Sequence, residues 1–145
     1  MMSSSTPGQA TYRGDLDVRV PHGGKKVYEG DAPIDPGSGN YHLLEIWAGE
    51  SPEGFSIYVS DDGRGWVDDV SKIFRIEAAE LMKLRAALRA AADDDLVELF
   101  AKRIADKTIK VPGRSDHYMD IVNFPSHWLA TNGISYSWAQ QISEA

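Results

Sequence analysis

The sequence predicts an α+β fold, in which an antiparallel sheet formed by about residues 41–76 packs on one or two helices. Apolar and polar residues alternate over residues 54–60, and a period of two is typical of a half-buried strand. After residue 77 the period changes, and leucines recur at three- and four-residue spacing on one face of a helix. A half-buried sheet and an amphipathic helix can cover each other's apolar faces, which gives the α+β class.

Length and composition indicate one small domain. The chain has 145 residues, of which 42% are hydrophobic, enough for a single core. It has no cysteine, which excludes disulfide scaffolds, thiolate metal sites and thiol catalysis. The first residues are small and polar without an apolar stretch, and no run of about 18 apolar residues occurs. We therefore expect a cytoplasmic protein without a membrane span.

The N-terminal part is expected to be peripheral. Residues 1–14 predict a disordered tail, and residues 15–145 a single α+β domain. Within that domain, alternation over residues 16–20 and again from residue 26 predicts a peripheral hairpin. Residues 30–40, with two prolines and three glycines, predict a loop.

The next stretch, residues 41–48, is apolar on both faces, which is typical of a strand in the middle of a sheet. Glu45 is unusual there, because it shares a face with Leu43 and Trp47. The following strand is expected to end at Asp62-Gly63, a pair that favours a tight hairpin turn. The return strand and one more short strand are expected to carry Trp66, Val67 and Val70, and then Phe74 and Ile76.

Two helices are expected after the sheet, at about residues 77–92 and 95–107. At about 100° per residue, Leu81, Leu84 and Leu88 fall on one side of the first. The apolar residues of the second centre roughly 110° away, so one straight helix could not bury both sets. Three aspartates, Asp93 to Asp95, lie between them and supply an N-cap.

The C-terminal part predicts a further strand region. Residues 108–111 and 118–124 favour strands, and Pro125 opens a short turn or helix that ends at Asn132-Gly133. Alternation then resumes from Ile134 to Trp138, and a helix-like tail follows.

Charge is distributed unevenly along the chain. Residues 1–71 carry a net charge of −7, residues 72–114 of +3 and residues 115–145 of −3. The simplest interpretation is that these are solvated faces. A dipolar surface that orients a charged partner is the functional alternative.

The best candidates for a metal or acid–base site are Asp116, His117, Asp120 and His127. Carboxylates and imidazoles suit zinc, iron or manganese. However, His117 and Asp120 are spaced for a helical face in a segment that predicts a strand, and no His-x3-His pattern occurs. We therefore interpret them as surface and turn residues, and expect no metal and no cofactor.

Other catalytic patterns are absent. The aspartates at 61–62 and 68–69 lack the ligand spacing of a calcium loop. There is no Gly-x-Ser-x-Gly elbow, and the glycines at 23–24 lack the spacer of a phosphate loop. The sequence thus favours a non-enzymatic protein, although a site assembled in space leaves no local motif.

One local resemblance bears on origin. Residues 76–92 read Ile-Glu-Ala-Ala-Glu-Leu-Met-Lys-Leu-Arg-Ala-Ala-Leu-Arg-Ala-Ala-Ala. This stretch, with the hairpin before it, resembles small uncharacterised proteins of high-GC actinobacteria and their phages, in which a β-hairpin precedes an alanine-rich helix. The resemblance implies a small cytoplasmic accessory protein, and it carries no catalytic residues over.

The preferred prediction is a protein-binding or regulatory domain whose partner is another protein. Its expected interaction surface comprises Trp128, Tyr136, Trp138, Arg85, Arg89 and Lys107. The alternative is a nucleic-acid binder that uses the basic segment 72–114, although a pI of about 5.0 disfavours phosphate contacts. A third possibility is an acidic inhibitor that mimics nucleic acid, with the aspartate pairs of the first half as its surface.

Overall fold

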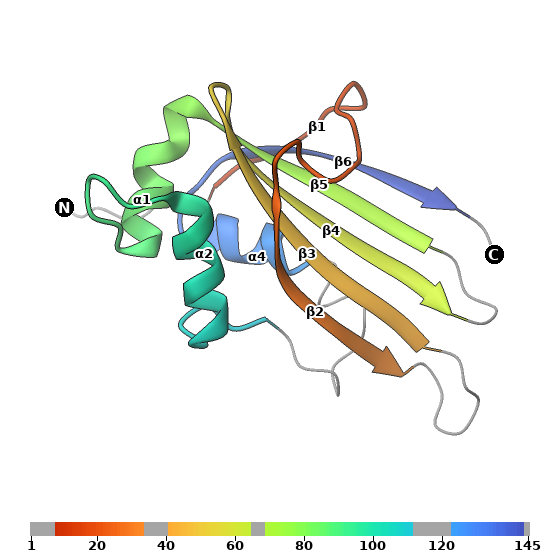
Figure 1. The fold of residues 1–145 in the computed structure, drawn as a ribbon. Helices are drawn as coiled ribbons and strands as arrows, with labels where there is room; N and C mark the ends of the chain where they lie inside the picture. Colours follow the sequence, from red (N-terminus) through yellow and green to blue (C-terminus); the bar gives the residue numbers. More distant parts are fainter. Residues whose placement is uncertain (1–7, 34–40, 65–68, 112–122, 144–145) are drawn as a thin grey trace.

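The computed structural model describes residues 8–33, 41–64, 69–111 and 123–143, and the statements below concern these residues. They form an α+β fold with a six-stranded sheet in the order β1-β6-β5-β4-β3-β2 (Figure 1). The strands are β1 (Ala10–Tyr12), β2 (Lys25–Pro33), β3 (Tyr41–Ser51), β4 (Gly54–Arg64), β5 (Asp69–Glu77) and β6 (Tyr136–Ser143). The helices are α1 (Leu81–Leu88), α2 (Leu96–Ala105) and α4 (Phe124–Thr131), with a 3-10 turn, η1 (Ala78–Glu80), before α1. The predicted α+β class is confirmed.

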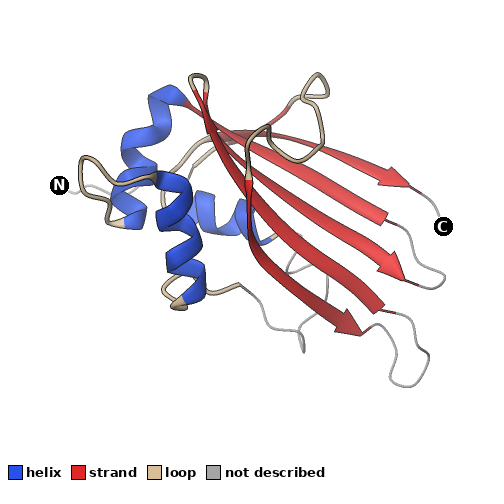
Figure 2. Cartoon of the chain, in the orientation of Figure 1, coloured by secondary structure: helices blue, strands red, loops and turns tan. Residues whose placement is uncertain are grey.

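The three helices lie on one side of the sheet, and the loop between β1 and β2 lies on the other (Figure 2). Neighbouring strands are antiparallel except for β1 and β6, which run parallel. The sheet is therefore mixed and not purely antiparallel. None of the helices in the described ranges has the length and apolar character needed to cross a membrane.

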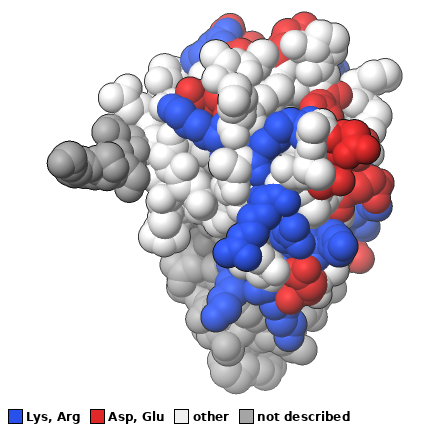
Figure 3. Space-filling view, turned by 90° about the vertical axis from the view of Figure 1, so that its left-hand side faces the viewer, with Lys and Arg blue, Asp and Glu red and all other residues white. Residues whose placement is uncertain are grey.

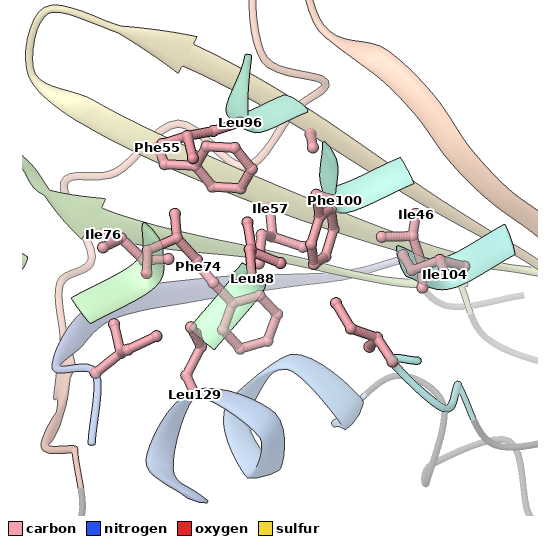
Figure 4. Close-up of a cluster of buried hydrophobic side chains, with 14 of the residues drawn as sticks. Ile46, Phe55, Ile57, Phe74, Ile76, Leu88, Leu96, Phe100, Ile104 and Leu129 are labelled. Atoms are coloured by element: carbon pink, nitrogen blue, oxygen red, sulfur yellow. The ribbon is translucent and has the colours of Figure 1, made fainter. Parts of the chain in front are cut away.

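The main core lies between the sheet and the helices. Side chains from β3, β4 and β5 meet those of α1, α2 and α4 there, and ten of them are labelled in Figure 4. Phe55 of β4 and Phe100 of α2 stack edge to face, with ring centroids 5.8 Å apart. On α1, Leu84 and Leu88 are buried as predicted, whereas Leu81 is only partly covered.

Strand β3 lies in the interior of the sheet, between β2 and β4, as predicted. Its two faces differ in burial. Leu44, Ile46 and Ala48 face the helices and are fully buried, whereas Leu43, Glu45 and Trp47 on the other face are only partly covered. The expectation of burial on both faces is wrong, and this explains how Glu45 can occupy a central strand: no helix covers its face in the described part of the chain.

The β4–β5 connection differs from the prediction. Asp62 and Gly63 pair with Leu43 and His42 of β3, so they extend β4 and the expected tight turn at this pair is wrong. The long pairing with β3 outweighs the local turn preference of Asp-Gly. Trp66 and Val67 lie outside the described residues. The two short strands expected after the turn are one continuous strand, β5.

The N-terminal part also differs. Ala10–Tyr12, within the stretch expected to be a disordered tail, forms β1 beside the C-terminal strand β6. Residues 16–20 form a loop instead of a strand, because Leu16 packs against Ile73 and Ala139 on the sheet. The second expected strand of this hairpin exists as β2, which pairs with β3 and extends to Pro33.

The break between two helices is confirmed. Asp95 has an extended backbone, and its side chain accepts a hydrogen bond from the backbone N–H of Glu98 at 2.9 Å. This is the geometry of an N-cap, and α2 begins at the next residue. The first helix is shorter than expected, because α1 ends at Leu88.

The C-terminal part is partly as predicted. The helix after Pro125 and the strand after Ile134 are confirmed as α4 and β6. Residues 108–111 form no strand, and Phe124 begins α4 instead of ending a strand. The predicted strand at 118–122 lies outside the described residues. The helix-like tail is wrong, because β6 continues to Ser143, paired with β5.

Candidate functional site

Arg89 ends α1 in the left-handed conformation, with φ 56°. The N–H of Ala90 donates to the carbonyl of Arg85 at 2.9 Å, and the N–H of Arg89 donates to that of Ala86 at 3.1 Å. This pair of bonds is a Schellman motif, in which glycine is the usual residue at the left-handed position. Here the position holds a long cation.

Lys107 repeats this feature just after α2. Its φ is 66°, and its N–H donates to the carbonyl of Ile104 at 3.2 Å. Arg89 and Lys107 are the two non-glycine residues with positive φ within the described ranges. Each cation therefore lies at a helix C-terminus, where the helix dipole favours positive charge but the backbone favours glycine.

Two further arginines hold the link between α1 and α2. Arg103 of α2 donates through Nε to the carbonyl of Leu88 at 3.0 Å, and Arg85 donates through Nη1 to the carbonyl of Ala91 at 3.0 Å. The bond from Arg103 brings its guanidinium to the end of α1, beside Arg89. Lys107 follows Arg103 by four residues and lies just beyond the C-terminal end of α2.

We call this cluster the basic patch; it consists of Arg85, Arg89, Lys102, Arg103 and Lys107. Figure 3 shows Lys and Arg side chains over the centre and lower part of the face in view, with Asp and Glu mostly on the right-hand side and at the top and one acidic group among the cations. In the described part of the chain, Arg89, Lys102 and Lys107 have no carboxylate within ion-pair distance. Their charges are therefore available to a partner.

The acids near the patch already have partners, and one of these partners, Arg103, belongs to the patch itself. Glu98 pairs with Lys25 at 2.9 Å, and Asp94 accepts from the N–H of Ala91 at 2.7 Å. Asp106 accepts from the N–H of Thr108 at 2.9 Å and lies 3.8 Å from Arg103. The hydrogen bonds from Thr108, more than the charges of Arg103 and Lys102, hold the pKa of Asp106 below its usual value.

The predicted aromatic residues do not join the patch as one surface. Tyr136 is 7% exposed and packs on Phe74, with ring centroids 5.9 Å apart. Trp128 is half-buried against Phe100 at 5.9 Å. Trp138 stacks on Tyr12 at 5.1 Å and lies below the ammonium group of Lys72. All three contribute to packing on the helical face of the sheet, whereas Arg85, Arg89 and Lys107 lie outside it.

The predicted metal candidates can be placed only in part. Asp116, His117 and Asp120 lie outside the described residues, and His127 is an exposed residue of α4. Within the described ranges, no group of three His, Asp or Glu side chains could hold a metal ion.

Two charged residues point into the helical face of the sheet. Asp61 of β4 is fully buried, and Lys72 of β5 donates to Oδ1 of Asn123 at 2.5 Å. Burial lowers the pKa of Lys72. The sequence contains the information that these two residues face the helices. Lys72 has the same strand parity as Phe74 and Ile76, and Asp61 has that of Ile57 and Val59. A charged side chain on the same strand face as core residues therefore indicates where the apolar core ends.

A hollow of about 420 Å³ lies on the opposite face of the sheet, under the β1–β2 loop. Its lining includes Arg75 of β5, which the sequence does not distinguish from other cations.

We compared the chain with protein-family models, with curated proteins and with solved structures, and none of the three comparisons gave a match. The candidate sites therefore rest on their own geometry.

Proposed function

We propose that the protein is a non-enzymatic binding domain that docks an acidic surface of a partner protein on the basic patch. The observation that supports this most directly is the geometry of Arg89 and Lys107. Both are cations without a carboxylate partner in the described chain, and both occupy left-handed positions at helix ends.

The energetic argument is that these residues are not optimal for folding. A side chain in the left-handed region costs about 1–2 kcal/mol. A cation at a helix C-terminus recovers only about 0.3–1 kcal/mol at an exposed site. Glycine would therefore be the more stabilising residue at both positions. Cations kept at strained positions are consistent with selection for binding, since strained residues cluster at functional sites.

The dimensions of the patch favour a protein over nucleic acid. A ten-residue helix such as α2 is about 15 Å long. The aspartates at 93–95 and Glu98 lie at its N-terminal end, so acids border the patch along the helix. A nucleic-acid backbone would extend past the patch and meet these acids, whereas an acidic loop or helix of a protein can end within it. The net charge of −7 also opposes a long polyanion.

The expectations of a cytoplasmic location, and of an origin among accessory proteins of actinobacteria or their phages, belong to this proposal and stay predictions. A regulatory role would follow if the acidic partner has a function of its own that docking blocks or promotes.

The decisive experiment compares three baits in affinity purification from the native host, followed by mass spectrometry. The baits are the wild-type protein, a patch variant and a control variant of equal charge. The patch variant carries Arg89→Gln, Lys102→Gln and Lys107→Gly. The control variant carries Arg19→Gln, Lys26→Gln and Lys83→Gln, three exposed cations that already pair with carboxylates at 3.1, 3.3 and 3.2 Å.

We expect wild type and control to enrich the same protein, and the patch variant to lose it while keeping its thermal stability. Purified partner and domain should then bind more weakly as salt rises, because screening acts on exposed charges. A partner that the patch variant retains would contradict the proposal. The nucleic-acid alternative is tested by anisotropy with single- and double-stranded DNA and RNA. Sub-micromolar, salt-sensitive binding that the patch variant loses would replace the proposal with that alternative.

A further inference from the structure

The loop between β1 and β2, residues 13–24, is anchored at two points on the sheet face that the helices leave open (Figure 1). At the first point, Leu16 is 8% exposed and packs against Ile73 and Ala139. At the second, Pro21 lies against Gly49 of β3. A Cβ atom on Gly49 would come within 2.6 Å of the Pro21 ring, so the glycine is required for this contact.

Between the two anchors, residues 17–20 pass over the sheet and leave a hollow of about 420 Å³. Its base is formed by strand residues Ser56, Ile73 and Arg75. The remaining lining residues come from the loop, from the end of β3 and from the β3–β4 turn; the charged ones are Asp17, Arg19, Glu50 and Glu53. The volume is that of a small-molecule site, and fixed anchors on both sides keep it open.

Arg75 is distinctive among the partly buried arginines of the described chain. Arg13 pairs with Asp15 at 2.7 Å, and Arg85 and Arg103 each donate to a backbone carbonyl at 3.0 Å. The guanidinium of Arg75 makes neither a hydrogen bond nor an ion pair in the described ranges. The pKa of Asp15 is lowered mainly by its hydrogen bond from Arg13. The charge of Arg75 contributes the least to this lowering and acts without a direct contact.

A guanidinium without a partner in a hollow is suited to a planar anion, because its fork of N–H groups matches a carboxylate. The other charges of the lining limit which anion can enter. Asp17 pairs with Arg19 at 3.1 Å, which leaves Glu50 and Glu53 as the other acids that line the hollow. With two cations and three acids, the lining has a net charge of −1, which disfavours a dianion such as phosphate.

We propose that this hollow binds a small zwitterion with the chemistry of a free α-amino acid. Its carboxylate accepts hydrogen bonds from Arg75, and its ammonium group donates to the carboxylates of Glu50 and Glu53. Ser56, opposite Arg75 across the β4–β5 pair, offers a hydroxyl to the same carboxylate. The site lies on the face of the sheet opposite the basic patch, so it is independent of the proposed docking function.

The test is a titration of the ¹⁵N-labelled protein, followed by NMR. The probes are L-alanine, L-leucine, L-glutamine and L-phenylalanine at millimolar concentration. We expect at least one of them to shift the backbone amides of the hollow, those at 17–22, 49–56 and 73–75, in a saturable manner. For a probe that binds, its N-acetyl derivative and its decarboxylated amine should each bind more weakly, because each lacks one charge. Inorganic phosphate should cause no saturable shift at these residues.

Two variants place the ligand. Arg75→Gln should weaken binding by about tenfold to a hundredfold, as expected for the loss of charge-assisted hydrogen bonds. Gly49→Ala should also weaken binding, because the new methyl group displaces Pro21 and narrows the hollow. Lys83→Gln is the control, since Lys83 is an exposed residue of α1 whose substitution removes the same unit of charge, and it does not line the hollow.

The ¹⁵N spectrum of each variant reports whether it is folded before it is titrated. No saturable shift with any of the four amino acids would overturn the proposal. It would be overturned equally by an amino acid that binds Arg75→Gln as tightly as the wild type, or by shifts that map to another face of the sheet.

Discussion

The guanidinium Nε of Arg103 donates a hydrogen bond to the carbonyl oxygen of Leu88 at 3.0 Å, and this bond joins α2 to the last residue of α1. The carbonyl groups at a helix C-terminus have no partner within the helix, so a cation that reaches them satisfies an acceptor and the helix dipole together. The same arginine belongs to the basic patch. Because its removal would affect folding as well as binding, a substitution of Arg103 tests folding and not binding.

Replacing Arg103 with Gln should therefore lower the free energy of unfolding by about 1.5–3 kcal/mol, the range for hydrogen bonds to charged groups. Chemical denaturation measures this change. Lys102→Gln is the matched control, because Lys102 is exposed and its substitution should change stability by no more than about 0.5 kcal/mol. Equal stability of the two variants would show that the bond to Leu88 contributes nothing.

Leu84 should be a major contributor to the core. It is fully buried on the face of α1 that meets the sheet. Leu84→Ala should destabilise the protein by about 2–5 kcal/mol through lost burial and the cavity left behind. Met82, on the same helix, is 83% exposed, and Met82→Ala should be nearly neutral. If the Leu84 variant melts within a degree or two of the wild type, this face of α1 is not core.

Asp95 should stabilise the start of α2. Its side chain accepts from the N–H of Glu98 at 2.9 Å, and loss of such a cap costs about 1 kcal/mol. We expect Asp95→Ala to lower the free energy of unfolding by that amount and Asp95→Asn to recover most of it, since asparagine also caps helices. Asp93→Ala is the control, because Asp93 makes no hydrogen bond in the described part of the chain. Similar losses for Asp93→Ala and Asp95→Ala would indicate a general effect of acidic charge and not a cap.

The features that sequence predicts correctly are those with a local cause. The break at 93–95 follows from two apolar faces with different directions and an aspartate in N-cap position. Strand β3 is identified by its apolar run and α4 by its proline start. In each case a few consecutive residues contain the physical reason, so the pattern and the structure agree.

The errors come from contacts that are distant in sequence. Ala10 pairs with Tyr136, and no local pattern in the polar N-terminus predicts a strand that needs this partner. Asp62-Gly63 has the composition of a turn, but pairing with β3 holds it extended. Leu16 alternates like a strand residue, yet it anchors a loop on Ile73.

The candidate sites were only partly predictable for the same reason. Arg85, Arg89 and Lys107 could be selected from charge, but the left-handed backbone of the last two cannot be read from an Arg or a Lys. The significance of Arg75 depends on two things: its side chain has no ion-pair partner in the described ranges, and a loop folds over the sheet above it. Both are tertiary properties, and they appear only when the register of β4 and β5 is known.

Lys107→Gly should stabilise the protein while it removes a charge from the basic patch. Glycine relieves the left-handed strain of about 1–2 kcal/mol, but it also increases the conformational freedom of the unfolded chain. The net gain should be about 0.5–1 kcal/mol, visible as a higher melting temperature. Lys102→Gly is the contrasting control, since glycine inside α2 should destabilise by about 1 kcal/mol. A lower melting temperature for Lys107→Gly would show that the lysine itself stabilises this helix end.

Lys72 predicts a dependence of stability on pH in the alkaline range. Burial lowers its pKa from the ordinary value of 10.5, so the folded protein releases this proton at a lower pH than the unfolded chain. Between the two pKa values the unfolded state binds more protons, and the contribution of Lys72 to stability must therefore rise with pH. Below the folded pKa, the cost of burying the charged ammonium group is fully present.

Lys72→Met keeps most of the apolar stem and removes the titrating group. The difference in free energy of unfolding between this variant and the wild type should shift in favour of the wild type as pH rises toward 10.5. Denaturation at several pH values from neutral upward measures the difference, and Lys83→Met, an exposed lysine, is the control. A difference that stays constant with pH would mean that Lys72 titrates alike in the folded and unfolded states. Its hydrogen bond to Asn123 and its position over the Trp138 ring would then fully compensate for its burial.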